Sequence, residues 1–96
     1  MFIVLLKFST NKSKAPSLMA AHNEWIKKGL DDGNFLIVGS LKPNLGGVIV
    51  AHNITKECLE KKVSQDPFVV ENIVSVELLE ISPSKVSEGL TRFLES

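Results

Sequence analysis

The chain has 96 residues, of which 44% are hydrophobic and 23% are charged, and this length and balance are typical of one soluble globular domain. Eleven basic and eleven acidic side chains give a formal net charge of zero, and ten of the basic residues are lysines, with Arg92 as the single arginine. Because affinity for nucleic acids rests on phosphate contacts, this balance argues against a nucleic-acid partner.

The cysteine content and the first residues of the chain indicate where in the cell the protein is found. Cys58 is the single cysteine, so no internal disulfide is possible, which is typical of a reducing compartment. The apolar run before Lys7 has no basic residues ahead of it and is too short for a signal peptide or a membrane span. We therefore expect a cytoplasmic protein with no membrane partner.

The first third of the chain predicts a strand and a helix. Residues 2–8 are almost continuously apolar and rich in β-forming residues, which indicates a central strand covered on both faces. After the polar segment 9–14, Pro16 suits the first turn of a helix whose apolar side chains recur at helical spacing to Leu30. Residues 32–34, Asp-Gly-Asn, tolerate positive φ and are expected to end this helix.

The middle of the chain predicts a hairpin followed by a second helix. Residues 35–38 form a second strand, and the turn-forming segment 42–47 connects it to a third strand at 48–51. Thr55 is a good N-cap for a helix over residues 56–64.

The last third predicts a fourth strand and a short helix. Residues 73–81 alternate between apolar and polar side chains, which indicates a strand that Pro83 ends. Residues 84–96 carry apolar side chains at helical spacing, with Gly89 weakening the middle of this amphipathic helix.

This order of elements predicts an α+β fold. Residues 1–82 fit a ferredoxin-like βαββαβ domain, with a four-stranded antiparallel sheet and both helices on one face, and residues 83–96 add a C-terminal helix. The other face of the sheet is apolar along the first strand and needs a cover. The simplest cover is a second copy, packed sheet against sheet about a two-fold axis. We expect a homodimer, or a higher oligomer built from it, with the C-terminal helix as a candidate part of the interface.

His22 is the first candidate for chemistry. It lies on the inward face of the predicted first helix, between Leu18 and Trp25. One interpretation is a partly buried histidine that is hydrogen-bonded to a carbonyl or carboxylate group. The other is a general acid or base, since an imidazole titrates near neutral pH and needs only an orienting partner.

Asp66 is the candidate partner. It lies in the stretch SQDPFVV, and an aspartate before Pro67 is a good helix cap, so capping alone would explain it. Because a residue before proline avoids helical dihedral angles, its side chain is also expected to leave the helix path. The helices of a ferredoxin-like fold are neighbours, so Asp66 and His22 can meet, and the carboxylate would then orient the imidazole.

Ser40 follows Gly39 at the end of the second strand, where its hydroxyl belongs either to a turn or to a pocket between the first helix and the sheet. The histidines, the cysteine and Asp66 lack the spacing of a metal-binding motif. We expect no metal site and no cofactor.

Several of these features occur together in a recognisable order. The series is a helix with His22, the segment Asp32-Gly33-Asn34-Phe35-Leu36-Ile37-Val38-Gly39-Ser40, a glycine hairpin, a second helix, and Asp66-Pro67-Phe68. This series resembles the YCII-related (YciI-like) family across roughly residues 1–82. The resemblance implies a dimeric α+β barrel and an active site in which His22 pairs with Asp66. A related branch of that family eliminates HCl from a chlorinated hydroxyquinone, which implies acid–base chemistry on small organic rings.

The chain also departs from the family's pattern. Ser40 stands where many members have a proline, and Leu18 and Met19 occupy the region where an arginine often precedes the histidine. The missing arginine weakens the expectation of an anionic substrate. Glu71-Asn72 replaces a pair of small residues, and the helix over 84–96 has no counterpart in the resemblance.

Two functions of different classes follow from these observations. The first is a cofactor-independent enzyme of the lyase or isomerase type, in which His22 moves a proton and Asp66 orients it. The small-molecule pocket would be lined by four residues: Trp25, Phe35, Ser40 and Phe68. The second is a non-catalytic dimeric ligand-binding or assembly protein, in which the His–Asp pair is a structural hydrogen bond. An oxygenase related through the same barrel is a remoter alternative, since no set of cofactor ligands is visible.

Overall fold

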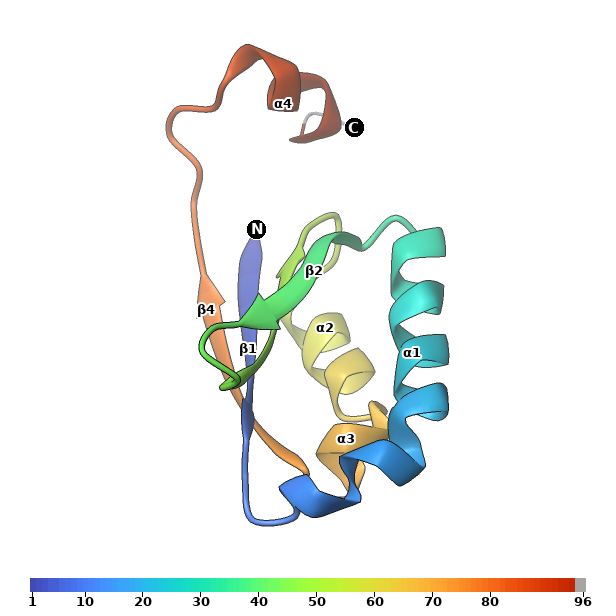
Figure 1. Ribbon diagram of the computed structural model, residues 1–96. Coiled ribbons are helices and arrows are strands. Elements are labelled where there is room, and N and C mark those ends of the chain that lie inside the picture. The colour runs from blue at the N-terminus through green and yellow to red at the C-terminus, as the bar shows by residue number, and fades with distance from the viewer. Residues whose placement is uncertain (95–96) are drawn as a thin grey trace.

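A computed structural model describes residues 1–94 of the chain, with side chains to residue 91. The elements in chain order are β1 (Phe2–Phe8), the 3-10 helix η1 (Lys12–Lys14), α1 (Ala15–Asp31), β2 (Phe35–Leu41), β3 (Gly46–Ala51), α2 (Lys56–Val63), α3 (Pro67–Val70), β4 (Val74–Glu80) and α4 (Glu88–Leu94). The four strands form one antiparallel sheet in the order β2-β3-β1-β4. Helices α1, α2 and α3 lie on one side of the sheet (Figure 1). The predicted α+β, ferredoxin-like fold is confirmed.

The sheet has one face covered by helices and one bare face. Along β1, Phe2, Val4 and Leu6 are buried, whereas Ile3 and Leu5 between them are only partly buried. Since side chains alternate along a strand, the buried set faces the helices and the other set faces away from them. Within one chain, β1 is therefore covered on one face and not on both.

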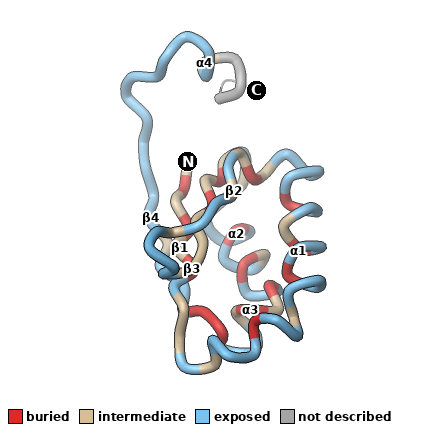
Figure 2. The backbone as a smooth tube through the Cα atoms, viewed as in Figure 1, coloured by how far each residue is buried: buried red, intermediate tan, exposed pale blue. Residues whose placement is uncertain are grey.

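The core lies between the sheet and the three helices, where the buried segments gather in Figure 2. One contact fixes the distance between α1 and β2. The ring of Phe35 occupies the space beside Gly29, where a Cβ atom would overlap the ring. The Trp25 ring meets Phe35 edge-on, with 5.2 Å between the ring centroids. A glycine in α1 thus lets an aromatic side chain from the sheet reach the helix backbone.

Most element boundaries agree with the predicted ones, and the differences are local. The predicted loop 9–14 contains the short helix η1, and the hairpin strands β2 and β3 extend further towards their turn. The turn itself has a cis peptide bond between Lys42 and Pro43, and Gly46 has a φ of 132° that glycine adopts readily.

The chain continues beyond the sheet after β4. The N–H of Ile81 donates to the carbonyl of Met1, and residues 81–87 then form neither helix nor strand. α4 lies beyond the end of the sheet (Figure 1). The predicted C-terminal helix over residues 84–96 begins only at Glu88, and its predicted end at Ser96 lies outside the described residues.

Among residues 1–94, no helix combines the length and the apolar composition that crossing a membrane requires.

Candidate functional site

His22 and Asp66 are hydrogen-bonded to each other across the interface between α1 and α3. The distance between Nδ1 of His22 and Oδ1 of Asp66 is 2.7 Å. The Asp66 side chain is completely buried and that of His22 is 11% exposed. Because a carboxylate oxygen can only accept, Nδ1 carries the hydrogen in this contact. In a neutral imidazole that carries its hydrogen on Nδ1, the other nitrogen, Nε2, is an acceptor.

The local sequence explains why Asp66 can reach His22. Its backbone is extended (φ −62°, ψ 125°), and Pro67 begins α3 directly after it. Oδ1 accepts a second hydrogen bond from the N–H of Phe68, at 3.0 Å, so Asp66 also caps α3. The other oxygen, Oδ2, is buried and has no hydrogen-bond partner among the described residues. Capping and pairing, the two interpretations of Asp66, therefore occur together on one oxygen atom.

The imidazole is also held through its face. The ring of Phe68 lies parallel to that of His22, with 3.9 Å between centroids and 3° between the planes. Asp66 and Phe68 thus restrain one nitrogen and one face of the same ring, although they are only two residues apart. This fixes the orientation of His22 and leaves the Nε2 edge for a ligand.

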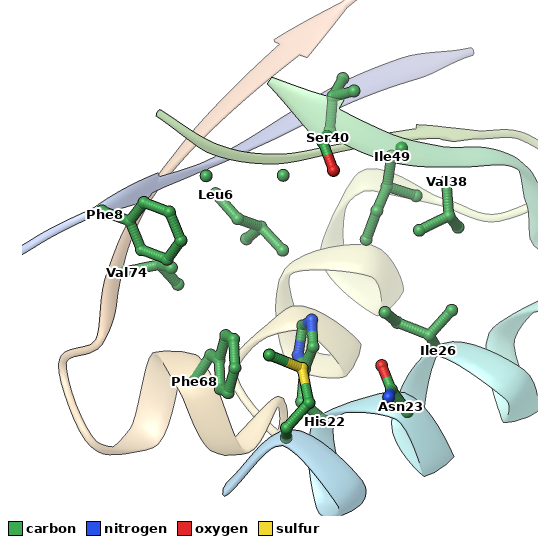
Figure 3. Close-up of a pocket in the computed structure, with 15 residues that line it drawn as sticks. Leu6, Phe8, His22, Asn23, Ile26, Val38, Ser40, Ile49, Phe68 and Val74 are labelled. Atoms are coloured by element: carbon green, nitrogen blue, oxygen red, sulfur yellow. The ribbon is translucent and has the colours of Figure 1, made fainter. Parts of the chain in front are cut away.

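A cavity of about 300 Å³ lies between α1 and the sheet, and His22 is part of its wall (Figure 3). Three of its lining side chains are polar, namely His22, Asn23 and Ser40. None of the lining residues within the described chain is an aspartate, glutamate, lysine or arginine. The remaining lining residues are apolar or glycine: Leu6, Phe8, Met19, Ile26, Val38, Gly39, Gly46, Gly47, Val48, Ile49, Phe68 and Val74.

The residues predicted for the pocket separate into two groups. Ser40 and Phe68 line the cavity together with His22, and the Ser40 hydroxyl points into it from β2 (Figure 3). Trp25 and Phe35 are not among its lining residues. Both are buried in the core, with 6.1 Å between the ring centroids of Trp25 and His22, and the indole N–H of Trp25 donates to the carbonyl of Lys62 at 3.0 Å.

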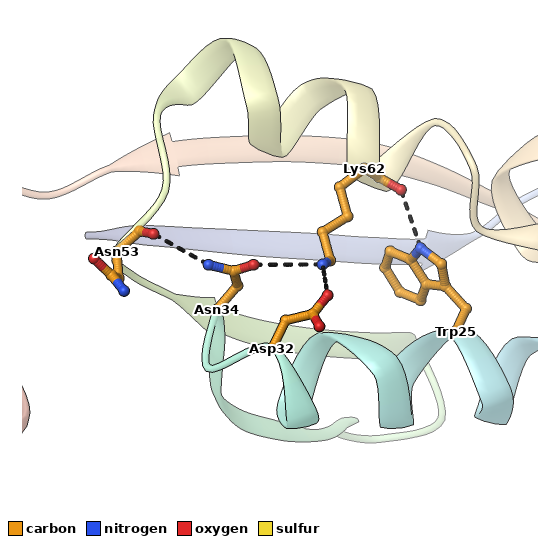
Figure 4. A network of polar contacts seen from close by, with 5 residues as sticks. All are labelled: Trp25, Asp32, Asn34, Asn53 and Lys62. Atoms are coloured by element: carbon orange, nitrogen blue, oxygen red, sulfur yellow. Dashed lines mark hydrogen bonds and ion pairs between the residues drawn. The ribbon is translucent and has the colours of Figure 1, made fainter.

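Lys62 is the centre of a separate polar network that connects α2 to the end of α1 (Figure 4). Its ammonium group donates to Oδ2 of Asp32 at 2.9 Å and to Oδ1 of Asn34 at 3.4 Å. The Asn34 amide in turn donates to the carbonyl of Asn53 at 3.1 Å. The hydrogen bond from Lys62 lowers the pKa of Asp32, because it favours the charged carboxylate. None of these residues lines the cavity.

Several lining residues were missed in the sequence. Met19, Asn23 and Ile26 lie three residues before, one after and four after His22, so helical spacing alone places them beside it. The sequence predicts Gly47 as a turn residue, whereas the structure places it in β3. Its position opposite Ser40 in the β2–β3 pair depends on the register of the hairpin.

Residues 1–94 contain no group of three or more histidine, cysteine, aspartate or glutamate side chains arranged to hold a metal ion.

Comparison with known proteins gives no assignment: no protein-family model matches the chain, and no curated protein is significantly similar to it in sequence.

Proposed function

We propose that this protein is an enzyme that performs acid–base chemistry on a small molecule, of the lyase or isomerase type and without a cofactor. The observation that carries this proposal is the pairing of His22 Nδ1 with a buried carboxylate at 2.7 Å, beside a cavity that His22 also lines. An imidazole that is oriented in this way presents its second nitrogen as a base.

The chemistry follows from the atoms that face the cavity. Nε2 of His22 accepts a proton from a carbon or oxygen atom of the substrate, and the Asp66 carboxylate stabilises the imidazolium that forms. In an isomerisation, the imidazolium returns this proton to a different atom of the substrate. In an elimination, the bonding electrons move to form a double bond as the leaving group departs. The hydroxyl of Ser40 and the amide of Asn23 are available to hydrogen-bond an oxygen on which negative charge develops.

A structural role for the same pair is the second candidate function, and one observation favours it. Asp66 caps α3 and is completely buried, so its bond to His22 also joins α1 to α3. Under this alternative, the protein is a non-catalytic ligand-binding or assembly protein, and the pair contributes to stability alone.

Proton exchange with solvent distinguishes the two functions. The purified protein is incubated in D₂O with a panel of neutral cyclic ketones and enones, and loss of C–H signals is followed by NMR. We expect exchange that falls about 100-fold or more in His22→Asn and Asp66→Asn. Asparagine at position 22 keeps a hydrogen-bond donor near the position of Nδ1, and asparagine at 66 keeps the cap, so both variants should fold.

Two outcomes count against catalysis at this site. One is exchange that His22→Asn leaves unchanged, and the other is a panel on which the wild-type protein has no effect beyond that of buffer. In either case, a loss of stability in the same variants would favour the structural alternative.

We also propose membership of the YCII-related family, a homodimeric assembly and a cytoplasmic location. The order of His22, Gly39-Ser40 and Asp66-Pro67-Phe68 supports the family, and the bare apolar face of the sheet supports the dimer. The single cysteine, Cys58, which is free and exposed, supports a reducing compartment.

A further inference from the structure

The floor of the cavity is formed by the sheet, at a position where one row of neighbouring residues across the strands lacks a side chain. Ser40 of β2 pairs with Gly47 of β3, and Gly47 pairs with Leu6 of β1. Residues in register across a sheet point to the same face, and both Ser40 and Leu6 line the cavity. Gly47 therefore occupies the one position of this three-residue row that has no side chain, between two residues that do.

The space above Gly47 is open to a side chain. A Cβ atom built at Gly47 has the carbonyl oxygen of Gly39 as its nearest neighbour, at 3.5 Å, which is an ordinary van der Waals contact. The backbone thus tolerates a larger residue at this position. The glycine is not required for packing, and its effect is to deepen the cavity.

The volume of the cavity limits the size of its ligand. An apolar cavity of about 150 Å³ is large enough to bind benzene. The present cavity, at about 300 Å³, is twice that size and accommodates a compact molecule of about two fused rings.

The lining limits the charge of the ligand. No charged side chain of the described chain lines the cavity, and the carboxyl group of Asp66 lies behind the imidazole, bonded to Nδ1. The ammonium group of Lys12 lies 4.6 Å from the centroid of the Phe8 ring, and Lys12 is not itself a lining residue. An anion would lose its hydration here without gaining a cationic partner, which is costly. A neutral molecule loses little, and the Ser40 hydroxyl can hydrogen-bond one polar atom.

Taking this cavity as the substrate site of the proposed function, we propose that it binds a neutral, mainly apolar ring compound of about two fused rings. The apolar body lies over Gly47, and an oxygen atom at one end hydrogen-bonds to Ser40. Gly47 is then the residue that determines the size of the ligand, because any side chain there would fill the floor of the cavity.

The experiment uses 1-naphthol as the probe and 1-naphthoate as its anionic counterpart, each titrated into the full-length protein. Binding is followed by calorimetry and by the amide NMR shifts of the β2–β3 hairpin. We expect 1-naphthol to bind at least tenfold more tightly than 1-naphthoate. In Gly47→Val, 1-naphthol binding should weaken at least tenfold, and in Ser40→Ala two- to tenfold, as is typical for one neutral hydrogen bond.

Gly89→Val is the matched control for Gly47→Val. Gly89 is exposed in α4 and does not line the cavity, and a Cβ atom built there has nothing within 4 Å. This variant adds the same side chain outside the cavity and should bind 1-naphthol like the wild-type protein. Thermal unfolding of both valine variants establishes that they fold.

Three results would overturn the inference: 1-naphthol bound equally well by a folded Gly47→Val variant, 1-naphthoate bound as tightly as 1-naphthol, or no 1-naphthol binding at millimolar concentration. Because binding is measured without turnover, these results are distinct from a failure of catalysis. Binding of 1-naphthol by the wild-type protein without any His22-dependent exchange would overturn the proposed function alone.

Discussion

One carboxylate oxygen, Oδ1 of Asp66, receives hydrogen bonds from both His22 and the backbone of Phe68. The second oxygen of the same group is buried without a hydrogen-bond partner among residues 1–94. An unsatisfied buried polar atom typically costs about 1–3 kcal/mol, and more when it is charged. Such local costs are concentrated at functional sites, where geometry matters more than stability. The cost of leaving Oδ2 without a partner is therefore an argument that Asp66 has a role beyond capping α3.

The first prediction compares two substitutions of His22. His22→Ala leaves the buried Asp66 carboxylate with a single donor, the N–H of Phe68, and should lower the free energy of unfolding by about 3–5 kcal/mol. His22→Asn retains a donor and should be clearly more stable than His22→Ala. Urea unfolding followed by Trp25 fluorescence measures both values. Equal stability of the two variants would mean that the carboxylate does not need a partner.

At the scale of elements, α1 is held at its middle and near its C-terminal end, and the cavity lies under its residues 19–26. At the middle, His22 bonds to the residue that caps α3. Towards the C-terminus, Gly29 contacts Phe35 and Asp32 bonds to Lys62. The three contacts involve β2, α2 and α3, so the position of α1 over the sheet does not depend on the cavity being filled.

The second prediction concerns Gly29. In an exposed helix interior, replacing glycine with alanine is worth about 1 kcal/mol in favour of alanine. Here the new methyl group would overlap the buried Phe35 ring, and overpacking of this kind typically costs about 1–3 kcal/mol. We expect Gly29→Ala to lower the melting temperature, because the buried Phe35 ring would have to shift. Gly29→Ala combined with Phe35→Leu should recover part of the loss, whereas a rise in melting temperature for the single variant would contradict the contact.

The third prediction is a pH dependence of the Asp32–Lys62 ion pair. The pKa of Asp32 is lowered in the folded protein, so its contribution to stability is present above the ordinary value of 3.8. This contribution is lost as the pH falls through the lowered value. Asp32→Asn should therefore destabilise the protein at pH 7 and low ionic strength, and the difference from wild type should be smaller at pH 2.

The effect should be small, because the Asp32 side chain is substantially exposed and salt screens such pairs. Urea unfolding at the two pH values measures it. A difference that persists unchanged at low pH would show that asparagine disturbs the end of α1 in another way.

At the scale of the whole molecule, the helix-free face of the sheet is the main feature that a single chain leaves unexplained. Ile37 is 59% exposed and Leu79 is 43% exposed, and Figure 2 shows no helix on that side of the sheet. By strand alternation and register, further apolar residues share this face: Ile3, Leu5, Leu41, Val48 and Val50. Monomeric proteins rarely expose apolar patches of more than a few hundred Å². A second copy on this face would bury it.

The fourth prediction tests this assembly. We expect the wild-type protein to sediment as a dimer at micromolar concentration, and Ile37→Asp to shift it to a monomer, because a charge would be buried in the interface. Val70→Asp is the control, since Val70 is 58% exposed in α3, on the helical side of the sheet. A wild-type monomer, or a dimer that only Val70→Asp disrupts, would contradict the sheet-to-sheet arrangement.

Residues 83–96 are also predicted to contribute to the dimer interface. Their place at the dimer interface stays a prediction, and sedimentation of a chain that ends at Ser82 tests it. The backbone bond between Ile81 and Met1 is kept in that chain, so β4 should still pair with β1 to its end.

The sequence by itself determined the order of the elements and the two residues that carry the proposed chemistry. Apolar periodicity, Pro67 and the glycine-rich hairpin act over a few residues each, so they can be interpreted without the fold. Pro67 also indicates that the Asp66 side chain points away from the preceding helix, but the sequence does not give its distance from His22. Only the packing of α1 against α3 places its carboxylate 2.7 Å from His22.

The tertiary structure alone decided which face of α1 lies over the cavity, and therefore which aromatic residues line it. Successive residues of a helix are about 100° apart, so Met19, Asn23 and Ile26 lie to one side of His22 and Trp25 lies to the other. The cavity is on the side of Met19, Asn23 and Ile26, so Trp25 does not line it. The register of β2 shifts between Phe35 and Ile37, which places Phe35 and Val38 on the same face and directs Phe35 to Gly29. The alternation of side chains along a strand is a local property, whereas a bulge and a register depend on the partner strand. For this reason, the position of Gly47 in the floor of the cavity could not be inferred from the sequence.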